Sequence, residues 1–90
     1  MKCIDKLVKC KQNKRIGNHS LMFSADGHIE LYYYHWTVIC KVDHNRCQIT
    51  IDDGGYKTSS TTRSINDYLR TDYIKNLIDV QKYKLIDKRN

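Results

Sequence analysis

The 90-residue sequence contains no proline, a single tryptophan and only four glycines. It also lacks any apolar run long enough to form a signal peptide or to cross a membrane. We therefore expect a cytoplasmic protein that makes no contact with a membrane. No low-complexity stretch or internal repeat divides a chain that is already the size of one small domain. Residues 1–90 are thus expected to fold as a single domain.

Motifs of several enzyme classes are missing as well. The four histidines do not form an HExxH motif, which excludes a metalloprotease of that class. The loop at residues 54–62 is rich in glycine and hydroxyl groups but lacks the GK[ST] core of a P-loop. The turn at residues 52–55 lacks the ligand series of an EF-hand. No carboxylate pair and no nucleophile with a nearby base stands out, so we expect a protein that is not an enzyme.

The charge balance is strongly basic. Sixteen lysine and arginine residues against 10 acidic residues give a formal net charge of +6, with much of the excess near the two ends. Basic proteins favour polyanions or acidic protein surfaces, and seven tyrosines with one tryptophan add flat rings that suit either partner. A solvated, lysine-rich surface that reflects an AT-rich genome explains the same composition.

Four cysteines form two pairs of equal spacing, Cys3 with Cys10 and Cys40 with Cys47. Cytosolic thiols stay reduced, which leaves zinc ligation or burial as free thiols. Cys40 and Cys47 are expected on the same side of a hairpin, near the reach of one zinc ion. In a continuous helix, Cys3 and Cys10 would be about 10 Å apart along the axis. A zinc site with four cysteines therefore requires that segment to turn, unless His44 replaces one ligand.

Helical periodicity appears at both ends of the chain. Apolar residues at helical spacing predict a helix over residues 3–10, followed by a loop. Near the other end, Thr61 or Thr62 is the candidate N-cap of a second helix, and Thr71 that of a third.

Period-two alternation predicts strands between these helices and one after them. The predicted strand segments are residues 19–24, 27–42, 46–52 and 82–87. The second run is too long for one flat strand and is expected to bend near Tyr34 and His35. The expected fold is α+β, an antiparallel meander of three to four strands with short helices packed on one face.

The strand after the bend is expected to have a core side and a partner side. The side expected to face the helices consists of Trp36, Val38, Cys40 and Val42. The opposite side is expected to carry an aromatic and basic patch for a partner, which consists of Tyr33, Lys41 and Lys57.

Residues 54–66 carry a more specific pattern, GGYKTSSTTRSIN. They resemble the segment GG-[WY]-[KR]-T-x-[TS]-T-x-x-x-[IL]-N of small phage proteins of uncharacterised function, where it follows a β-hairpin and leads into a helix. The resemblance covers roughly residues 33–70, with His35 and Thr37 similar to the start of the hairpin. This chain has Tyr56 where tryptophan is usual and Thr62 where a basic residue is common.

Small phage proteins without catalytic motifs are frequently accessory or anti-defence factors. In its overall features the chain looks like anti-CRISPR proteins, which inhibit CRISPR nucleases by binding them. The resemblance implies a protein that acts in the host cytoplasm and inhibits a host defence nuclease by covering a surface that the nuclease needs. The alternative is a zinc-stabilised module that binds nucleic acid.

Overall fold

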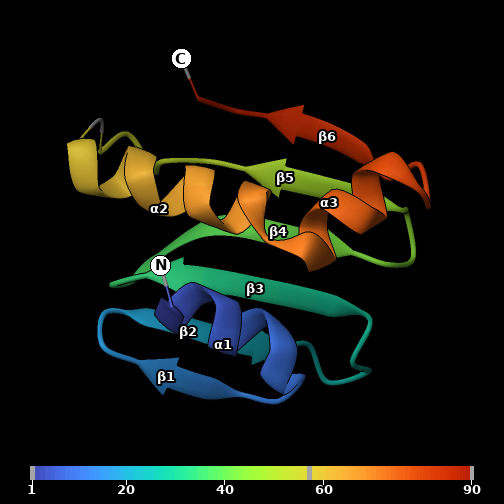
Figure 1. Ribbon diagram of the computed structural model, residues 1–90, viewed down its shortest axis with the longest axis horizontal. Coiled ribbons are helices and arrows are strands. Elements are labelled where there is room, and N and C mark those ends of the chain that lie inside the picture. Colours follow the sequence, from blue (N-terminus) through green and yellow to red (C-terminus); the bar gives the residue numbers. More distant parts are fainter. Residues whose placement is uncertain (1, 57, 90) are drawn as a thin grey trace.

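The computed structural model describes residues 2–56 and 58–89, apart from the side chains of residues 2 and 3. The described residues form three helices and six strands (Figure 1). The helices are α1 (Lys2–Cys10), α2 (Ser59–Arg70) and α3 (Asp72–Asp79). The strands are β1 (Lys14–Ile16), β2 (His19–Phe23), β3 (Ile29–Tyr34), β4 (Thr37–Asp43), β5 (Gln48–Ile51) and β6 (Lys84–Asp87).

All six strands belong to one sheet, in the order in which the chain makes them. Strands β1 to β5 are antiparallel to their neighbours, whereas β6 returns through α2 and α3 and pairs parallel with β5. A parallel pair needs such a long crossover because the connection must travel the length of the sheet. The predicted α+β class is confirmed. The predicted strand number is too small, and the sheet is mixed rather than wholly antiparallel.

The strand that the sequence pattern missed is β1. It has three residues, and Lys14 and Arg15 are both exposed, so it carries no apolar alternation. Short, charged strands are typical of sheet edges, where they discourage pairing with another chain. The segment therefore resembles a polar loop in the sequence alone.

The three helices all lie on one face of the sheet, as predicted, with α1 over β1 and β2 and α2 over β4 (Figure 1). Each helix buries a stripe at spacings of three or four residues: Ile4, Leu7 and Val8 in α1, Ile65 and Tyr68 in α2, and Ile74 and Leu77 in α3. Full burial of one such aliphatic side chain stabilises a fold by roughly 1.5–3 kcal/mol. These stripes hold the helices to the sheet.

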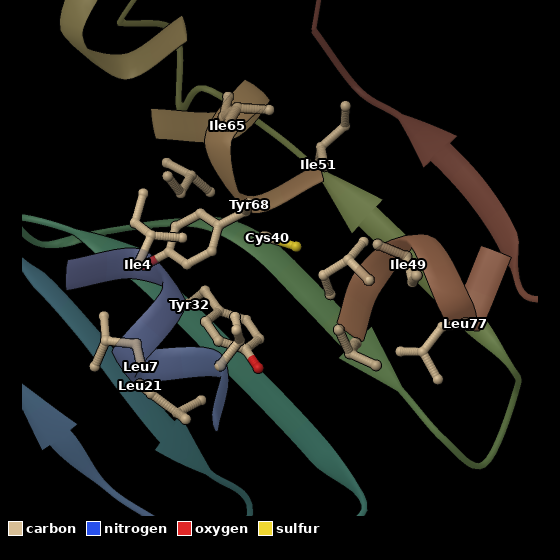
Figure 2. Close-up of a cluster of buried hydrophobic side chains, with 14 residues drawn as sticks. Ile4, Leu7, Leu21, Tyr32, Cys40, Ile49, Ile51, Ile65, Tyr68 and Leu77 are labelled. Carbon is tan, nitrogen blue, oxygen red and sulfur yellow. The ribbon is translucent and has the colours of Figure 1, made fainter. Parts of the chain in front are cut away.

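The core between the helices and the sheet contains two stacked tyrosines. The rings of Tyr32 in β3 and Tyr68 in α2 lie 4.9 Å apart between centroids, and both residues are fully buried. Figure 2 shows them among aliphatic side chains, which come from all three helices and from β2, β4 and β5, with Cys40 beside them. Tilted ring pairs at this distance add attraction beyond the burial of their area.

The helix starts agree in part with the sequence prediction. The N-cap of α3 is Thr71, whose Oγ1 accepts a hydrogen bond from the Ile74 amide, as predicted. The N-cap of α2 is Thr58, whose Oγ1 accepts from the Thr61 amide at 3.2 Å. The predicted cap at Thr61 or Thr62 is therefore wrong by one helical turn, because several consecutive hydroxyl residues were equally suitable caps.

The long run at residues 27–42 folds into β3 and β4 rather than one bent strand. Tyr34 pairs with Thr37, which leaves His35 and Trp36 as a two-residue turn. Trp36 is consequently 87% exposed, and its predicted place in the core is wrong.

A β-bulge overturns a second part of the predicted core face. Tyr32 pairs with Cys40 while Tyr33 pairs with Val38, so Ile39 is an extra residue in β4. The extra residue shifts the alternation by one position. Cys40 faces the core as predicted, but Val38 faces the other side of the sheet.

Candidate functional site

The side of the sheet that faces away from the helices, the open face, is the first candidate surface. Residues paired in register share a face, so rows of side chains cross it from strand to strand. One row consists of Arg15, Ser20, Tyr33 and Val38. The next consists of Met22, Leu31, Lys41, Thr50 and Ile86. Apolar side chains thus adjoin one another on β2, β3 and β4, whereas Lys41 and Thr50 separate them from Ile86 on β6.

The structure brings two of the three predicted partner-binding residues onto this face. Tyr33 is half-buried, and Lys41 is exposed one row away from it. Met22, beside them on β2, is 47% exposed. The third residue, Lys57, lies outside the described residues. The shared face of Tyr33 and Lys41 agrees with the prediction, and the role of these residues in binding stays a prediction.

Positive charge also collects on the open face. Arg15 and Lys41 lie in its rows, and Lys84 joins them because β6 pairs Lys84 with Gln48. Asp43 stands in the same row as Lys84, and the cations outnumber it on this face, which therefore complements acidic groups on a partner.

A hollow at one end of the molecule is the second candidate surface, and sequence reasoning missed it. It lies where the β3–β4 turn meets the start of α2 (at the left in Figure 1) and has a volume of about 370 Å³. The rings that line it are Tyr34, His35, Trp36 and Tyr56, and the hydroxyl residues are Thr37, Thr58, Ser60 and Thr61. We call it the Trp36–Tyr56 hollow. If His35 and Trp36 had been assigned to a hairpin turn, the sequence would have predicted an exposed tryptophan. That exposed ring was the available signal for the hollow.

Backbone contacts hold the two sides of this hollow. His35 adopts a φ of 55°, and its amide donates to the carbonyl of Asn18 at 2.7 Å. On the other side Gly54 and Gly55 have φ values of 63° and 86°, as predicted for at least one of them. The Tyr56 amide donates to the carbonyl of Asp53 at 3.0 Å. Both exposed rings therefore stand on fixed turns.

Arginines lie beside the Trp36 ring and along a groove next to the hollow. The guanidinium of Arg15 lies 6.0 Å from the centroid of the Trp36 ring. A shallow groove of about 400 Å³ runs along α2, shares Thr58 with the hollow and is lined by Arg63 and Arg70. Asp67 is the acidic residue in this groove.

The third notable feature is a buried carboxylate, which the sequence prediction also missed. Glu30 on β3 is only 2% exposed. One of its oxygens accepts from the hydroxyl of Tyr32 at 2.6 Å, and the other accepts from His44 Nε2 and the Tyr73 hydroxyl. The hydroxyl of Tyr83 lies 2.7 Å from His44 Nδ1. The cluster ties α3, the β4–β5 turn and the start of β6 to the centre of the sheet.

The cluster favours a charged Glu30. Burial alone acts to raise the pKa of Glu30, but the hydrogen bonds from His44, Tyr32 and Tyr73 together outweigh it, and the pKa lies below its ordinary value. Burial and the neighbouring carboxylate raise the pKa of Tyr73, so this hydroxyl stays a donor. Burial lowers the pKa of Lys11, whose Nζ lies 3.0 Å from the centroid of the Tyr73 ring. Glu30 and Tyr32 are two positions apart on β3, so alternation places Glu30 on the same side of the sheet as Tyr32. This was the signal in the sequence for a buried carboxylate.

The cysteines do not come together in the described structure. Cys40 is fully buried and pairs with Ile51, whereas Cys47 lies exposed in the β4–β5 turn with a φ of 53°, so the predicted approach of these two is wrong. Cys10 hydrogen-bonds to the carbonyl of Leu7 at the end of α1.

The described residues do not fit a zinc site. Within residues 2–56 and 58–89, no group of three or more His, Cys, Asp or Glu side chains is arranged to hold a metal. Cys3 lies in α1 and its side chain is outside the described part. His44, the suggested replacement ligand, contacts Glu30 and Tyr83 instead. Zinc binding stays a prediction.

Comparisons with known proteins do not assign a function to these surfaces. No family model, curated protein or solved structure matches the chain. None of the helices in the described part is long and apolar enough to span a bilayer.

Proposed function

We propose that this chain is a non-catalytic binding protein of the small phage type that inhibits a host defence nuclease through its open face. The observation that carries the proposal is the apolar character of that face. An antiparallel sheet with one face in water normally alternates apolar residues inside with polar residues outside. Here Met22, Leu31, Tyr33 and Val38 occupy outward positions in adjoining rows. Continuous apolar surface of this kind is typical of interaction sites.

The charges on the open face indicate the chemistry of the partner. Arg15, Lys41 and Lys84 give it a basic character, in a chain with a net charge of +6. A basic inhibitor does not imitate DNA, so it acts by covering an acidic or mobile protein surface. Tyr33, half-buried among aliphatic neighbours, is the candidate anchor, because tyrosines at the centre of an interface often dominate binding. The nuclease class rests on the likeness of residues 54–66 to the phage segment.

The proposal is tested by affinity capture from host lysate, with and without prior digestion of the nucleic acids in the lysate. The captured protein is then purified and titrated with the chain and its variants. We expect capture to survive digestion, and Tyr33→Ala and Lys41→Glu to weaken binding by about tenfold or more. Lys6→Glu on the exposed side of α1 is the charge-matched control and should bind like the native chain. Capture that disappears on digestion would favour nucleic acid as the partner instead.

A further inference from the structure

The Trp36–Tyr56 hollow presents two aromatic rings to solvent on rigid supports. Trp36 is 87% exposed and Tyr56 is 62% exposed. In this two-residue hairpin turn the first residue, His35, has a positive φ and Trp36 does not, and such a turn favours glycine rather than histidine at its first position. The chain therefore keeps an unfavourable turn that displays a large ring, on a surface separate from the centre of the open face.

The position of Tyr56 is fixed against the same turn. A side chain at residue 54 would meet Thr37, the residue directly after Trp36, so the glycine turn lies against the start of β4. The Tyr56 ring also lies near Gly54. The backbone turns that carry the two rings are thus held against each other, which reduces the entropy lost when a ligand is bound between the rings.

The lining of the hollow selects among ligands. Hydroxyl groups and rings line it, and none of the described residues in its lining is acidic. Arg15 stands beside the Trp36 ring, and the adjoining groove along α2 presents Arg63 and Arg70. Exposed π-faces with arginines along a continuing groove are the chemistry of single-stranded nucleic acid sites, where bases stack and cations meet phosphates.

We propose that the Trp36–Tyr56 hollow binds single-stranded nucleic acid. One unpaired base stacks on Trp36 or Tyr56, with its polar edge toward the hydroxyl groups, and the following phosphates lie along α2 near Arg63 and Arg70. The volume of about 370 Å³ lies within the range of pockets that hold small ligands. A base in a duplex cannot expose its face in this way, so the site discriminates against paired strands.

Trp36 is the only tryptophan, so its fluorescence reports directly on the hollow. Titration with oligo-dT and oligo-U of about ten nucleotides should quench this fluorescence in a saturable manner. The two oligonucleotides distinguish DNA from RNA. A blunt duplex of equal length should bind at least about tenfold more weakly at moderate salt.

Variants separate stacking from general charge attraction, with fluorescence anisotropy of labelled oligonucleotide as the readout. Trp36→Ala and Tyr56→Ala should each weaken binding by about tenfold, whereas Trp36→Phe and Tyr56→Phe should retain most of it. Arg63→Glu should weaken binding and reduce its salt dependence, whereas Arg46→Glu, in the β4–β5 turn at the other end of the sheet, should not.

Three results would overturn the proposal. The first is that neither oligonucleotide quenches the fluorescence of Trp36, whether or not a peptide quenches it. The second is equal binding of duplex and single strand. The third is native affinity in both alanine variants, with circular dichroism showing that each is folded.

Discussion

A Cβ atom at Gly54 would lie 2.7 Å from Cγ2 of Thr37, which is closer than real side chains approach. The turn after β5 thus fits against the start of β4 only because residue 54 is a glycine. The amide of Gly54 also donates to the carboxylate of Asp52 at 3.0 Å. The close approach of Gly54 to Thr37 holds the Tyr56 side of the hollow against its Trp36 side.

Gly54→Ala should therefore destabilise the fold more than Gly55→Ala. Both glycines have positive φ, which costs a side chain about 1–2 kcal/mol, but a Cβ at Gly55 meets open space. For Gly54→Ala the clash with Thr37 should raise the loss to about 2–4 kcal/mol. Chemical denaturation of both variants measures the difference, and equal losses would show that the loop simply moves away from the hairpin.

Glu30→Gln should lower the free energy of unfolding by about 2–3 kcal/mol at neutral pH. The negative charge is lost, and the amide NH2 cannot accept the hydrogen bonds that one carboxylate oxygen takes from Tyr32 or from His44 and Tyr73. Tyr83→Phe removes a contact of the same cluster that lies further from the carboxylate, and should cost less. Urea titrations of the two variants give the comparison. If Glu30→Gln is as stable as the native chain, the cluster does not hold α3 and β6 in place.

The same carboxylate gives stability a defined dependence on pH. Because the pKa of Glu30 is lower in the folded chain than its ordinary value of 4.5, the folded state binds fewer protons than the unfolded state between the two values. Its contribution is complete above 4.5 and is lost as pH falls through the folded value. Melting temperatures of the native chain and Glu30→Gln should therefore converge in acid. Parallel curves down to the lowest pH would contradict this.

Periodicity predicted the elements of this fold where side chains alternate regularly, and it failed where one residue breaks the alternation. The helix at α1, the cap at Thr71 and the last strand follow from local patterns that tertiary contacts do not override. The bulge at Ile39 could not be predicted, because the same run of apolar residues fits a strand with an extra residue and a strand with a bend.

The candidate sites divide in the same way. Tyr33 and Lys41 share a face as predicted, but only because the extra residue at the bulge in β4 restores the parity that the two-residue turn at His35 and Trp36 reverses. The hollow depends on contact between residues 34–37 and 54–61, which are distant in sequence. The Glu30 cluster likewise joins residues up to 43 positions apart. Alternation along β3 places Glu30 on the core side, but no local pattern identifies the distant residues that it contacts.

Thiol labelling should distinguish the cysteines by their surroundings. Burial raises the pKa of Cys40 to about 12, against an ordinary value of 9.0, so its thiolate fraction falls by about a thousandfold. Iodoacetamide should therefore modify exposed Cys47 quickly in the folded chain and Cys40 only after unfolding, as peptide mass spectrometry can show. Fast labelling of Cys40 would mean that the core around it opens readily.

The zinc prediction has its own measurement. If the cysteines hold zinc, the purified chain should contain about one equivalent, and chelation should lower its melting temperature. The positions of Cys40 and Cys47 lead us to expect no such shift from these two thiols. A chelator effect that persists in Cys40→Ala but disappears in Cys10→Ala would assign the metal to the α1 end.

Replacing His35 and Trp36 together by Gly-Asn should stabilise the chain by about 0.5–1 kcal/mol while it abolishes binding of oligonucleotides in the hollow. The gain comes from relief of the positive φ at His35, which glycine accepts without strain. Thermal denaturation and anisotropy on the same sample measure both effects. A variant that is less stable would show that the Trp36 turn serves the fold rather than a ligand.

The most direct test of the central claim begins with the host nuclease that the chain captures from a lysate whose nucleic acids have been digested. This nuclease is titrated by calorimetry with the native chain, Tyr33→Ala and Lys6→Glu, and its cleavage activity is assayed in parallel. The account predicts saturable binding and loss of cleavage with the native chain and Lys6→Glu, and binding at least about tenfold weaker with Tyr33→Ala, which remains folded. Equal binding and equal inhibition by Tyr33→Ala would contradict a role for the open face. Capture of no nuclease after digestion would contradict the proposed function itself.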